Sequence, residues 1–159
     1  FVVVGRIMAE IIISIEQLKD KLERLSKGLA NKTPLLRRIA NTLQNVTEES
    51  FDKQTSPFGR RWKANSPKTL AGKRGNKVLI KSGHLSQSFT QKITGNSVRV
   101  GTNKTYAAIH QFGGKAGRGK KVNIPARPFM PIKSNGEIPK DLEDKLEKEV
   151  VDYLKDVLR

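Results

Sequence analysis

Side chains that could act as general bases or nucleophiles are few in this 159-residue sequence. It contains two histidines, His84 and His110, each with serine or glutamine nearby. A serine hydrolase also needs a third group that orients the histidine, and an oxyanion hole, and the sequence shows neither. We therefore predict structural roles for both histidines and assign no catalytic residue.

Metal and nucleotide sites are equally poorly supported. Cysteine is absent, which excludes disulfides and thiolate sites, and two histidines are too few for a typical zinc site. The glycine-containing segment 72–77 lacks the Walker spacing, and Lys81-Ser82-Gly83 has no glycine-rich run before it. The sequence therefore predicts a protein without metal, cofactor or enzymatic activity.

Basic side chains are concentrated in the middle of the chain. The sequence holds 31 Lys and Arg against 15 Asp and Glu, a net charge of +16. Residues 51–133 contain 18 of these cations and one carboxylate, Asp52, whereas residues 1–50 and 134–159 carry net charges of +2 and −3. One carboxylate cannot form the acid pair of a glycosidase or the acidic cluster that binds catalytic magnesium. Most hydrolase activities are therefore disfavoured.

The cationic middle segment suits a polyanionic or acidic neighbour. Its cations could release many counterions from a nucleic acid, so a general nucleic-acid-binding module is one hypothesis. No RRM signature, zinc finger or helix-turn-helix pattern is present, and aromatic residues are not regularly interleaved with the basic loops. Charge that meets an acidic protein is an equally good explanation. A membrane partner is not expected, because no stretch approaches the roughly 20 apolar residues that cross a bilayer.

The first part of the chain predicts one strand and two helices. We expect residues 1–7 to be added or upstream residues and the domain to cover 8–159. The β-branched run 11–15 predicts a short strand. Apolar residues at spacings of three and four over 15–29 predict an amphipathic helix that ends near Gly28. We expect this helix to lie on a sheet, although its two heptads could also begin a coiled coil.

A second helix is predicted over 34–54, with Thr33 as its capping residue and Pro34 at its first position. The polar, basic stretch 59–81 then predicts a long loop, and we place flexible basic arms near 56–81 and 113–122.

Short strands and two further helices complete the expected fold. Strands are predicted at 78–80, 89–93, 97–101 and 122–124, with a turn at Gly95-Asn96. A short helix over 106–112 should stop at Gly113-Gly114, and a terminal amphipathic helix should follow Pro139. The fold class is therefore α+β, a small antiparallel sheet packed with N-terminal and C-terminal amphipathic helices and joined by long basic loops.

Six strings of special residues follow one another in the middle of the chain. They are SPFGRRWK at 56–63, SPKTL at 66–70, LIKSGHL at 79–85, GTN at 101–103, YAAIHQFGG at 106–114 and IPARPF at 124–129. In this order and spacing they resemble the phage virion morphogenesis family, the tail completion proteins of Mu-like and P2-like phages and prophages. The resemblance covers about residues 8–133, and its most diagnostic strings are those at 106–114 and 124–129. One departure is His84, where many relatives carry arginine.

The resemblance implies a structural virion component that acts in tail completion and head-tail joining, without catalysis. It also implies a ring of identical copies in the virion, assembled in the bacterial host cytoplasm beside other neck, tail or head-completion proteins. In such a ring the cationic segment could face DNA passing through the lumen.

Two sets of residues are candidates for these roles. The partner-contact candidates are Arg60, Arg61, Trp62, Lys63, Lys73, Arg74, Arg118, Lys120, Lys121, Arg127 and Phe129. The structural-motif candidates are Tyr106, His110, Gln111, Phe112, Gly113, Gly114, Pro125 and Pro128. Large aromatic and forked guanidinium side chains suit docking surfaces, so we interpret Trp62 and the Arg60-Arg61 pair as intersubunit contacts. We expect Tyr106, Ile109 and Phe112 to point into the core from one helical face, and the two prolines to fix an extended turn around Arg127.

Overall fold

A computed structural model describes the backbone of residues 15–159 and the side chains of residues 19–159. The elements follow in the order α1 (Ile15–Ala30), α2 (Thr33–Lys53), α3 (Pro67–Ala71), β1 (Phe89–Thr94), β2 (Ser97–Thr102), α4 (Ala107–Phe112), β3 (Gly114–Ala116), the short 3-10 helix η1 (Arg118–Lys120), β4 (Val122–Ile124) and α5 (Lys140–Leu158). The fold is α+β, as the sequence predicts. The strand predicted over 11–15 lies outside the described residues, except for Ile15, which begins α1.

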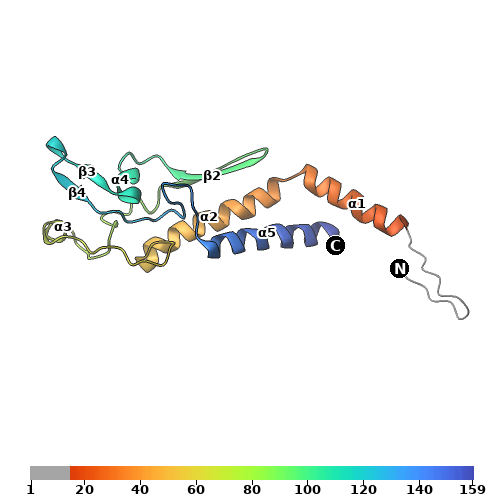
Figure 1. Cartoon of the computed structure of the whole chain (residues 1–159), viewed down its shortest axis with the longest axis horizontal. Coiled ribbons are helices and arrows are strands. Elements are labelled where there is room, and N and C mark those ends of the chain that lie inside the picture. The colour runs from red at the N-terminus through yellow and green to blue at the C-terminus, as the bar shows by residue number, and fades with distance from the viewer. Residues whose placement is uncertain (1–14) are drawn as a thin grey trace, which may run out of the picture.

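The molecule is elongated, with helices at one end and hairpins and loops at the other. Figure 1 shows α2 and α5 side by side, α1 continuing beyond the start of α2, and the α3 loop, α4 and the β3–β4 hairpin at the opposite end. The two sheets have two strands each. In the described part of the chain, no helix is long and apolar enough to span a membrane.

Among the three long helices, α5 contacts both α1 and α2. Helix α1 packs against α5 and not against a sheet, so the prediction of a helix laid on a sheet is wrong. An apolar face of helical period gives the buried side but not the partner that covers it. The contact is made by the end of α1, where the Tyr153 hydroxyl donates to the carbonyls of Gly28 and Asn31 at 2.7 and 2.9 Å.

Helix α2 begins one residue before the predicted position, and its cap differs from the prediction. Thr33 is the first helical residue, and the preceding Lys32 makes no side-chain capping bond. The side chain of Asn31 instead accepts a hydrogen bond from the Thr33 N–H at 3.3 Å. At the other end, Gln54 terminates the helix in the left-handed conformation, with φ 56°.

The predicted hairpin between 89 and 101 is confirmed. Strands β1 and β2 pair in antiparallel register from Phe89 with Thr102 to Thr94 with Ser97, which leaves Gly95-Asn96 as the two-residue turn. Both strands contact α2. A second hairpin, β3 with β4, occupies the stretch that the sequence presents as a basic arm near 113–122.

The strand predicted over 78–80 is wrong, because these residues form a turn with Leu79 at φ 60°. The Val78 N–H donates to the side-chain oxygen of Gln54, and the side-chain nitrogen of Gln54 donates to the Val78 carbonyl. The glutamine thus replaces the neighbouring strand that the segment would otherwise need.

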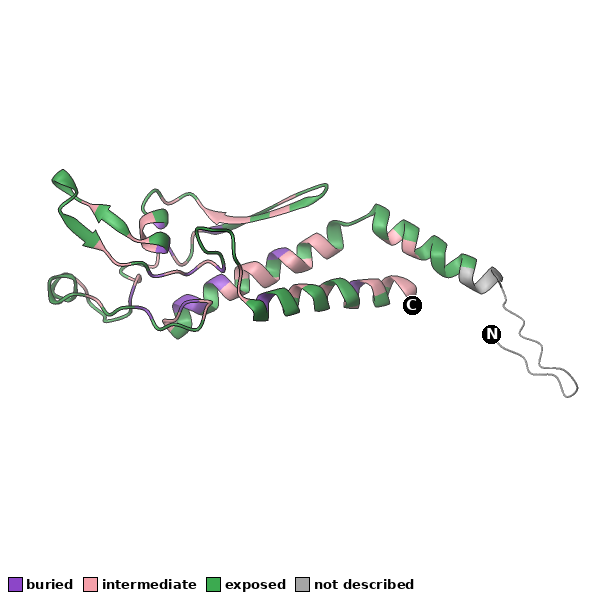
Figure 2. Ribbon diagram, in the orientation of Figure 1, coloured by how far each residue is buried: buried purple, intermediate pink, exposed green. Residues whose placement is uncertain are grey.

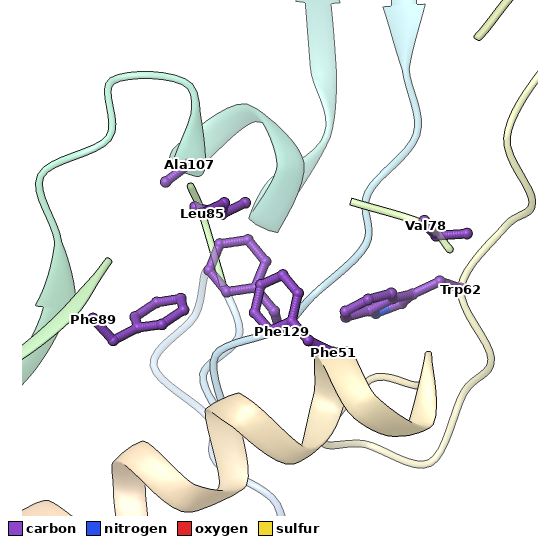
Figure 3. Close-up of a cluster of buried hydrophobic side chains, with 7 residues drawn as sticks. All are labelled: Phe51, Trp62, Val78, Leu85, Phe89, Ala107 and Phe129. Carbon is purple, nitrogen blue, oxygen red and sulfur yellow. The ribbon is translucent and has the colours of Figure 1, made fainter. Parts of the chain in front are cut away.

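The core is a small aromatic cluster between α2 and the hairpins. Its buried members are Phe51, Trp62, Val78, Leu85, Phe89, Ala107 and Phe129 (Figure 3). Phe51 lies at the centre, with its ring centroid 5.4 Å from Trp62, 5.9 Å from Phe89 and 5.4 Å from Phe129. Edge and tilted contacts at these distances add to the burial of the rings themselves. Figure 2 shows buried positions along α2 and beneath the loops, while the hairpin tips and most of α1 are exposed.

Candidate assembly surface

The two most diagnostic strings, 106–114 and 124–129, pack against each other as one unit. Gln111 on α4 is 4% exposed and uses both ends of its amide. Its oxygen accepts from the N–H groups of Phe129 and Met130, both at 2.9 Å. Its nitrogen donates to the carbonyls of Met130 and Ile132 at 3.0 and 2.9 Å. One side chain therefore fixes the extended segment that follows the second string.

Backbone contacts complete this unit. The Arg127 N–H donates to the His110 carbonyl at 2.7 Å, and the Pro128 carbonyl accepts from the Trp62 indole at 2.8 Å. Gly113 has φ 75°, and a Cβ there would lie 2.9 Å from the Ala126 nitrogen. Glycine at this position is needed both for the conformation and for the close approach of the two strings.

Trp62 and Phe129, predicted as partner contacts, lie in the core and not on the surface. Trp62 is 6% exposed and Phe129 1% exposed. The sequence interpretation is wrong about the exposure of both residues. Around Trp62, Pro57 and Gly59 lie in a tight turn that returns the chain to α2. In that turn the backbone N–H of Trp62 donates to the Gln54 carbonyl, and Thr55 forms an isolated antiparallel β-bridge with Arg61.

Helix α4 turns a different face inward from the one predicted. Tyr106 and Phe112 are 43% and 51% exposed, whereas Ala107 and Gln111 are buried. The expectation that Tyr106, Ile109 and Phe112 point into the core is therefore wrong for the two aromatic residues. The reason is that the polar amide of Gln111 takes the inward position, where it pairs backbone groups that no apolar side chain could satisfy.

Most of the predicted basic contact residues are exposed. They are Arg60, Arg61, Lys63, Arg74, Arg118, Lys120 and Lys121. Arg60 and Arg61 lie in the turn after α2, and the last three lie at the tip of the β3–β4 hairpin. Between Lys19 and Arg159, ion pairs to the cations of 51–133 are limited to Lys53 with Glu49 and Lys133 with Glu137. The cationic segment is therefore largely unneutralised within the chain.

Two of the predicted contact residues, Lys73 and Arg127, converge on a cavity of about 540 Å³. We call it the cationic cavity, and its charged or titratable lining residues are Lys68, Lys73, Lys81, His84, His110 and Arg127. Its apolar lining includes Leu79, Tyr106 and Ile124, and no carboxylate belongs to the described lining. The lining comes from the α3 loop, the segment 79–85, α4, β4 and residue 127. Figure 1 shows the α3 loop, α4 and β4 at the end of the molecule opposite α1.

Burial and mutual repulsion set the electrostatics of this cavity. Arg127 is 8% exposed, and burial lowers the pKa of its guanidinium. Burial also lowers the pKa of Lys73, followed by repulsion from Arg127 and Lys81. The pKa of His110 is lowered by burial and then by Arg127, which favours the neutral imidazole. Burial is the first cause of all three shifts, and repulsion between cations adds to it at Lys73 and His110.

The sequence interpretation missed part of this arrangement. Lys68, Lys81 and His84 belong to strings that the sequence singles out, but nothing in their spacing indicates that they share a cavity with Arg127. Gln111 is among the structural-motif candidates, but the sequence does not predict that its amide pairs backbone groups, and Gln54 is not among the candidates, since an isolated glutamine has no periodic signal. Among the described residues, no group of three or more His, Cys, Asp or Glu side chains could hold a metal ion.

Comparison with known proteins identifies related chains. The model of the phage virion morphogenesis family matches residues 13–159. FluMu G protein 2, from a Mu-like prophage of Haemophilus influenzae, is 38% identical over 140 residues, which cover 86% of this chain and 95% of that protein. Protein G of Escherichia phage Mu, whose name proposes capsid assembly as its role, is 28% identical over 134 residues, or 80% of this chain and 85% of the relative. No solved structure gives a significant match.

Proposed function

This chain belongs to the phage virion morphogenesis family, and we propose that it completes the tail of a Mu-like virion and joins the tail to the head. Its general role is in building the phage particle. The finer role at the neck is our proposal, together with its presence in the virion after assembly in the host cytoplasm.

The observation that carries this proposal is the extent of the family match. It runs from residue 13 to residue 159 and therefore includes the cationic middle segment and the terminal helix α5. The Haemophilus relative is matched over 95% of its own length, so the similarity spans nearly that whole protein.

The geometry supports a role by contact and not by catalysis. Both histidines line the cationic cavity, where the neighbouring charged groups are cations. A histidine general base is commonly oriented by a carboxylate, and the described lining of the cavity contains none. We therefore propose a non-enzymatic protein whose partners are other neck, tail or head-completion proteins, arranged around a ring of its own copies.

Deletion of the gene from an inducible phage or prophage tests this proposal. We expect complete heads and separate or abnormal tails in electron micrographs, with loss of infectious titre that a plasmid copy restores. Joined, infectious particles made without the protein would contradict it.

A second candidate function is binding to nucleic acid, favoured by the 18 cations and single carboxylate of residues 51–133. This hypothesis expects submicromolar affinity for duplex DNA near physiological salt and a steep, linear fall of log K with log salt. If DNA binding disappears at moderate salt, the cationic segment would instead be assigned to contacts with proteins. In a ring, cations that face the lumen would combine the two functions.

A further inference from the structure

The cationic cavity contains a buried charge that the fold does not neutralise. Buried charges in proteins are normally paired with an opposite charge, because desolvation of an unpaired ion is costly. Arg127 is 8% exposed, yet its guanidinium donates to the neutral carbonyls of Lys63 and Ala64, at 2.8 and 3.0 Å from Nε and Nη2. Carbonyl acceptors satisfy these donors without neutralising the guanidinium charge.

A purely structural role for Arg127 leaves part of its guanidinium unused. Its Nη1 makes no hydrogen bond to the described residues, whereas Nε and Nη2 hold the loop at 63–64. In the described chain, His110 Nδ1 is the one side-chain polar atom that is both sealed from solvent and without a partner. Nη1 is therefore open to solvent and available to a ligand.

Two lysines add to the charge at this point. Lys73 feels repulsion from Arg127 and from Lys81, which places the three cations within electrostatic reach of one another. The Lys73 ammonium is held by the Lys77 carbonyl, again a neutral acceptor. An anion that entered the cavity would meet three cations and no competing carboxylate from the described lining.

The shape of the cavity favours a side chain over a nucleic-acid backbone. Arg127 is recessed, and a carboxylate on a flexible stem can reach a recessed guanidinium and accept a charge-assisted hydrogen bond from its free Nη1. Leu79, Ile124 and the 43% exposed ring of Tyr106 add an apolar wall, which suits the hydrocarbon part of a peptide. Duplex phosphates lie on a broad, rigid surface and match the exposed basic hairpin tip better than this recess.

We propose that the cationic cavity binds an acidic peptide segment of another virion protein. A carboxylate of that segment lies between Arg127, Lys73 and Lys81, and a neighbouring apolar side chain packs on Tyr106 and Leu79. The inference rests on the proposed function for the source of the peptide, but the binding chemistry belongs to the isolated chain.

The test uses the purified full chain and a capped synthetic peptide that contains Glu-Leu-Glu-Phe, with a Gln-Leu-Gln-Phe peptide as its uncharged control. Calorimetry gives the affinity, and NMR of the His110 ring reports on the cavity. We expect the acidic peptide alone to bind and to shift the His110 signals. Lys81→Gln and the double variant Lys73→Gln with Lys81→Gln should weaken binding by about tenfold or more. Lys92→Gln, on exposed β1 outside the cavity, is the matched control and should bind normally.

Each outcome decides the proposal, once thermal melts show that the variants are folded. Equal binding of the two peptides, no binding at millimolar peptide, or an equal loss in Lys92→Gln would overturn it. A short oligothymidylate that binds more tightly than the peptide, and loses affinity in the same lysine variants, would assign the cavity to nucleic acid instead. None of these results depends on the gene-deletion phenotype, so the inference and the proposed function can fail separately.

Discussion

Two glutamine amides, Gln111 in the interior and the partly buried Gln54, hold segments of this protein that lack regular secondary structure. Gln111 pairs four backbone groups of residues 129–132. Gln54 pairs both backbone groups of Val78 and the carbonyl of Phe51. In each case the amide supplies a donor and an acceptor where a sheet would supply a neighbouring strand. The loops are therefore ordered by side chains, and their stability depends on single residues.

Gln111→Glu should destabilise the fold while changing few atoms. The carboxylate cannot donate to the carbonyls of Met130 and Ile132, and it would be buried. We expect a loss of at least about 2 kcal/mol in the free energy of unfolding, measured by urea denaturation. Gln87→Glu, on an exposed residue, is the control. Equal stabilities of the two variants would show that the amide contacts are dispensable.

Trp62→Ala should lower the free energy of unfolding far more than Tyr106→Ala. Trp62 is buried against Phe51 and bonded to Pro128, so its removal leaves a cavity and an unpaired carbonyl. We expect a cost of about 3–5 kcal/mol for Trp62→Ala. Tyr106 is 43% exposed, so Tyr106→Ala should change the free energy of unfolding little. Thermal denaturation followed by circular dichroism measures both, and a small effect at Trp62 would contradict its place in the core.

His110 should make stability fall on mild acidification. Its pKa is lowered in the fold by burial and by Arg127, while the unfolded histidine keeps its ordinary value of about 6.5. As the pH falls below about 6.5, the unfolded chain takes up a proton that the folded chain resists, so stability decreases until the folded pKa is reached.

Replacement by glutamine isolates this effect. The paired carboxylates of Glu49, Glu137 and Asp156 have lowered pKa values, which keeps their titration below this pH range. The melting temperature of His110→Gln should therefore change less between pH 7.5 and 5.5 than that of the parent chain. An unchanged profile in His110→Gln would refute the assignment.

The long helices and the first hairpin could be predicted because their signals are local. An apolar period of 3.6 marks α1, α2 and α5, and a Gly-Asn pair between alternating strands marks the β1–β2 turn. The partner of α1 and the inward face of α4 could not be predicted, since both depend on which distant residues cover them. The turn at 78–80 could not be predicted either, because the backbone of Val78 is hydrogen-bonded by the distant side chain of Gln54 and not by a neighbouring strand.

The contact between α1 and α5 depends on the absence of a side chain at Gly28. A Cβ there would lie 2.5 Å from Val157 Cγ1, so Gly28→Ala should force the helices apart and lower the melting temperature. With Val157→Ala the same substitution should cost less, because Val157 Cγ1 and Cγ2, at 2.5 and 2.7 Å, are removed while Val157 Cβ remains at 3.2 Å. Alanine also favours the helix over glycine by up to about 1 kcal/mol. A double-mutant cycle by chemical denaturation measures this coupling. Additive effects would show that the two residues do not meet.

Burial is limited and uneven across the molecule. In the described part of the chain ten apolar residues are buried, and seven of them belong to the aromatic cluster. Helix α1 attaches through its end near Gly28, whereas Leu22 is 56% exposed. A helix with so little tertiary contact is only marginally stable in water. The isolated chain should therefore be ordered at its centre and weakly ordered along much of α1.

Hydrogen exchange should reproduce this gradient. We expect backbone amides at 19–23 in α1 to exchange about a hundredfold faster or more than those at 43–51 in α2, because the latter lie against the core and the β1–β2 hairpin. Mass spectrometry of the full chain measures both segments in one sample. Equal protection would indicate that α1 is held by a contact beyond those described here.

The charge of the site was visible in the sequence, but its geometry was not. Counting side chains establishes the excess of cations in residues 51–133. It does not show that Trp62 faces inward while Arg127 is recessed, because both lie among similar prolines, glycines and arginines. Convergence of Lys73, Lys81 and Arg127 is produced by loops folded over one another, which no local pattern encodes.

The scarcity of carboxylates around the cavity also limits how two copies of this chain can approach each other. Faces of like sign repel, most strongly at low ionic strength, so copies should not stack cation to cation. Neighbouring copies in a closed ring meet through different faces, so this face would have to adjoin the central channel, the outer rim or the acid-rich segment 134–159 of the next copy.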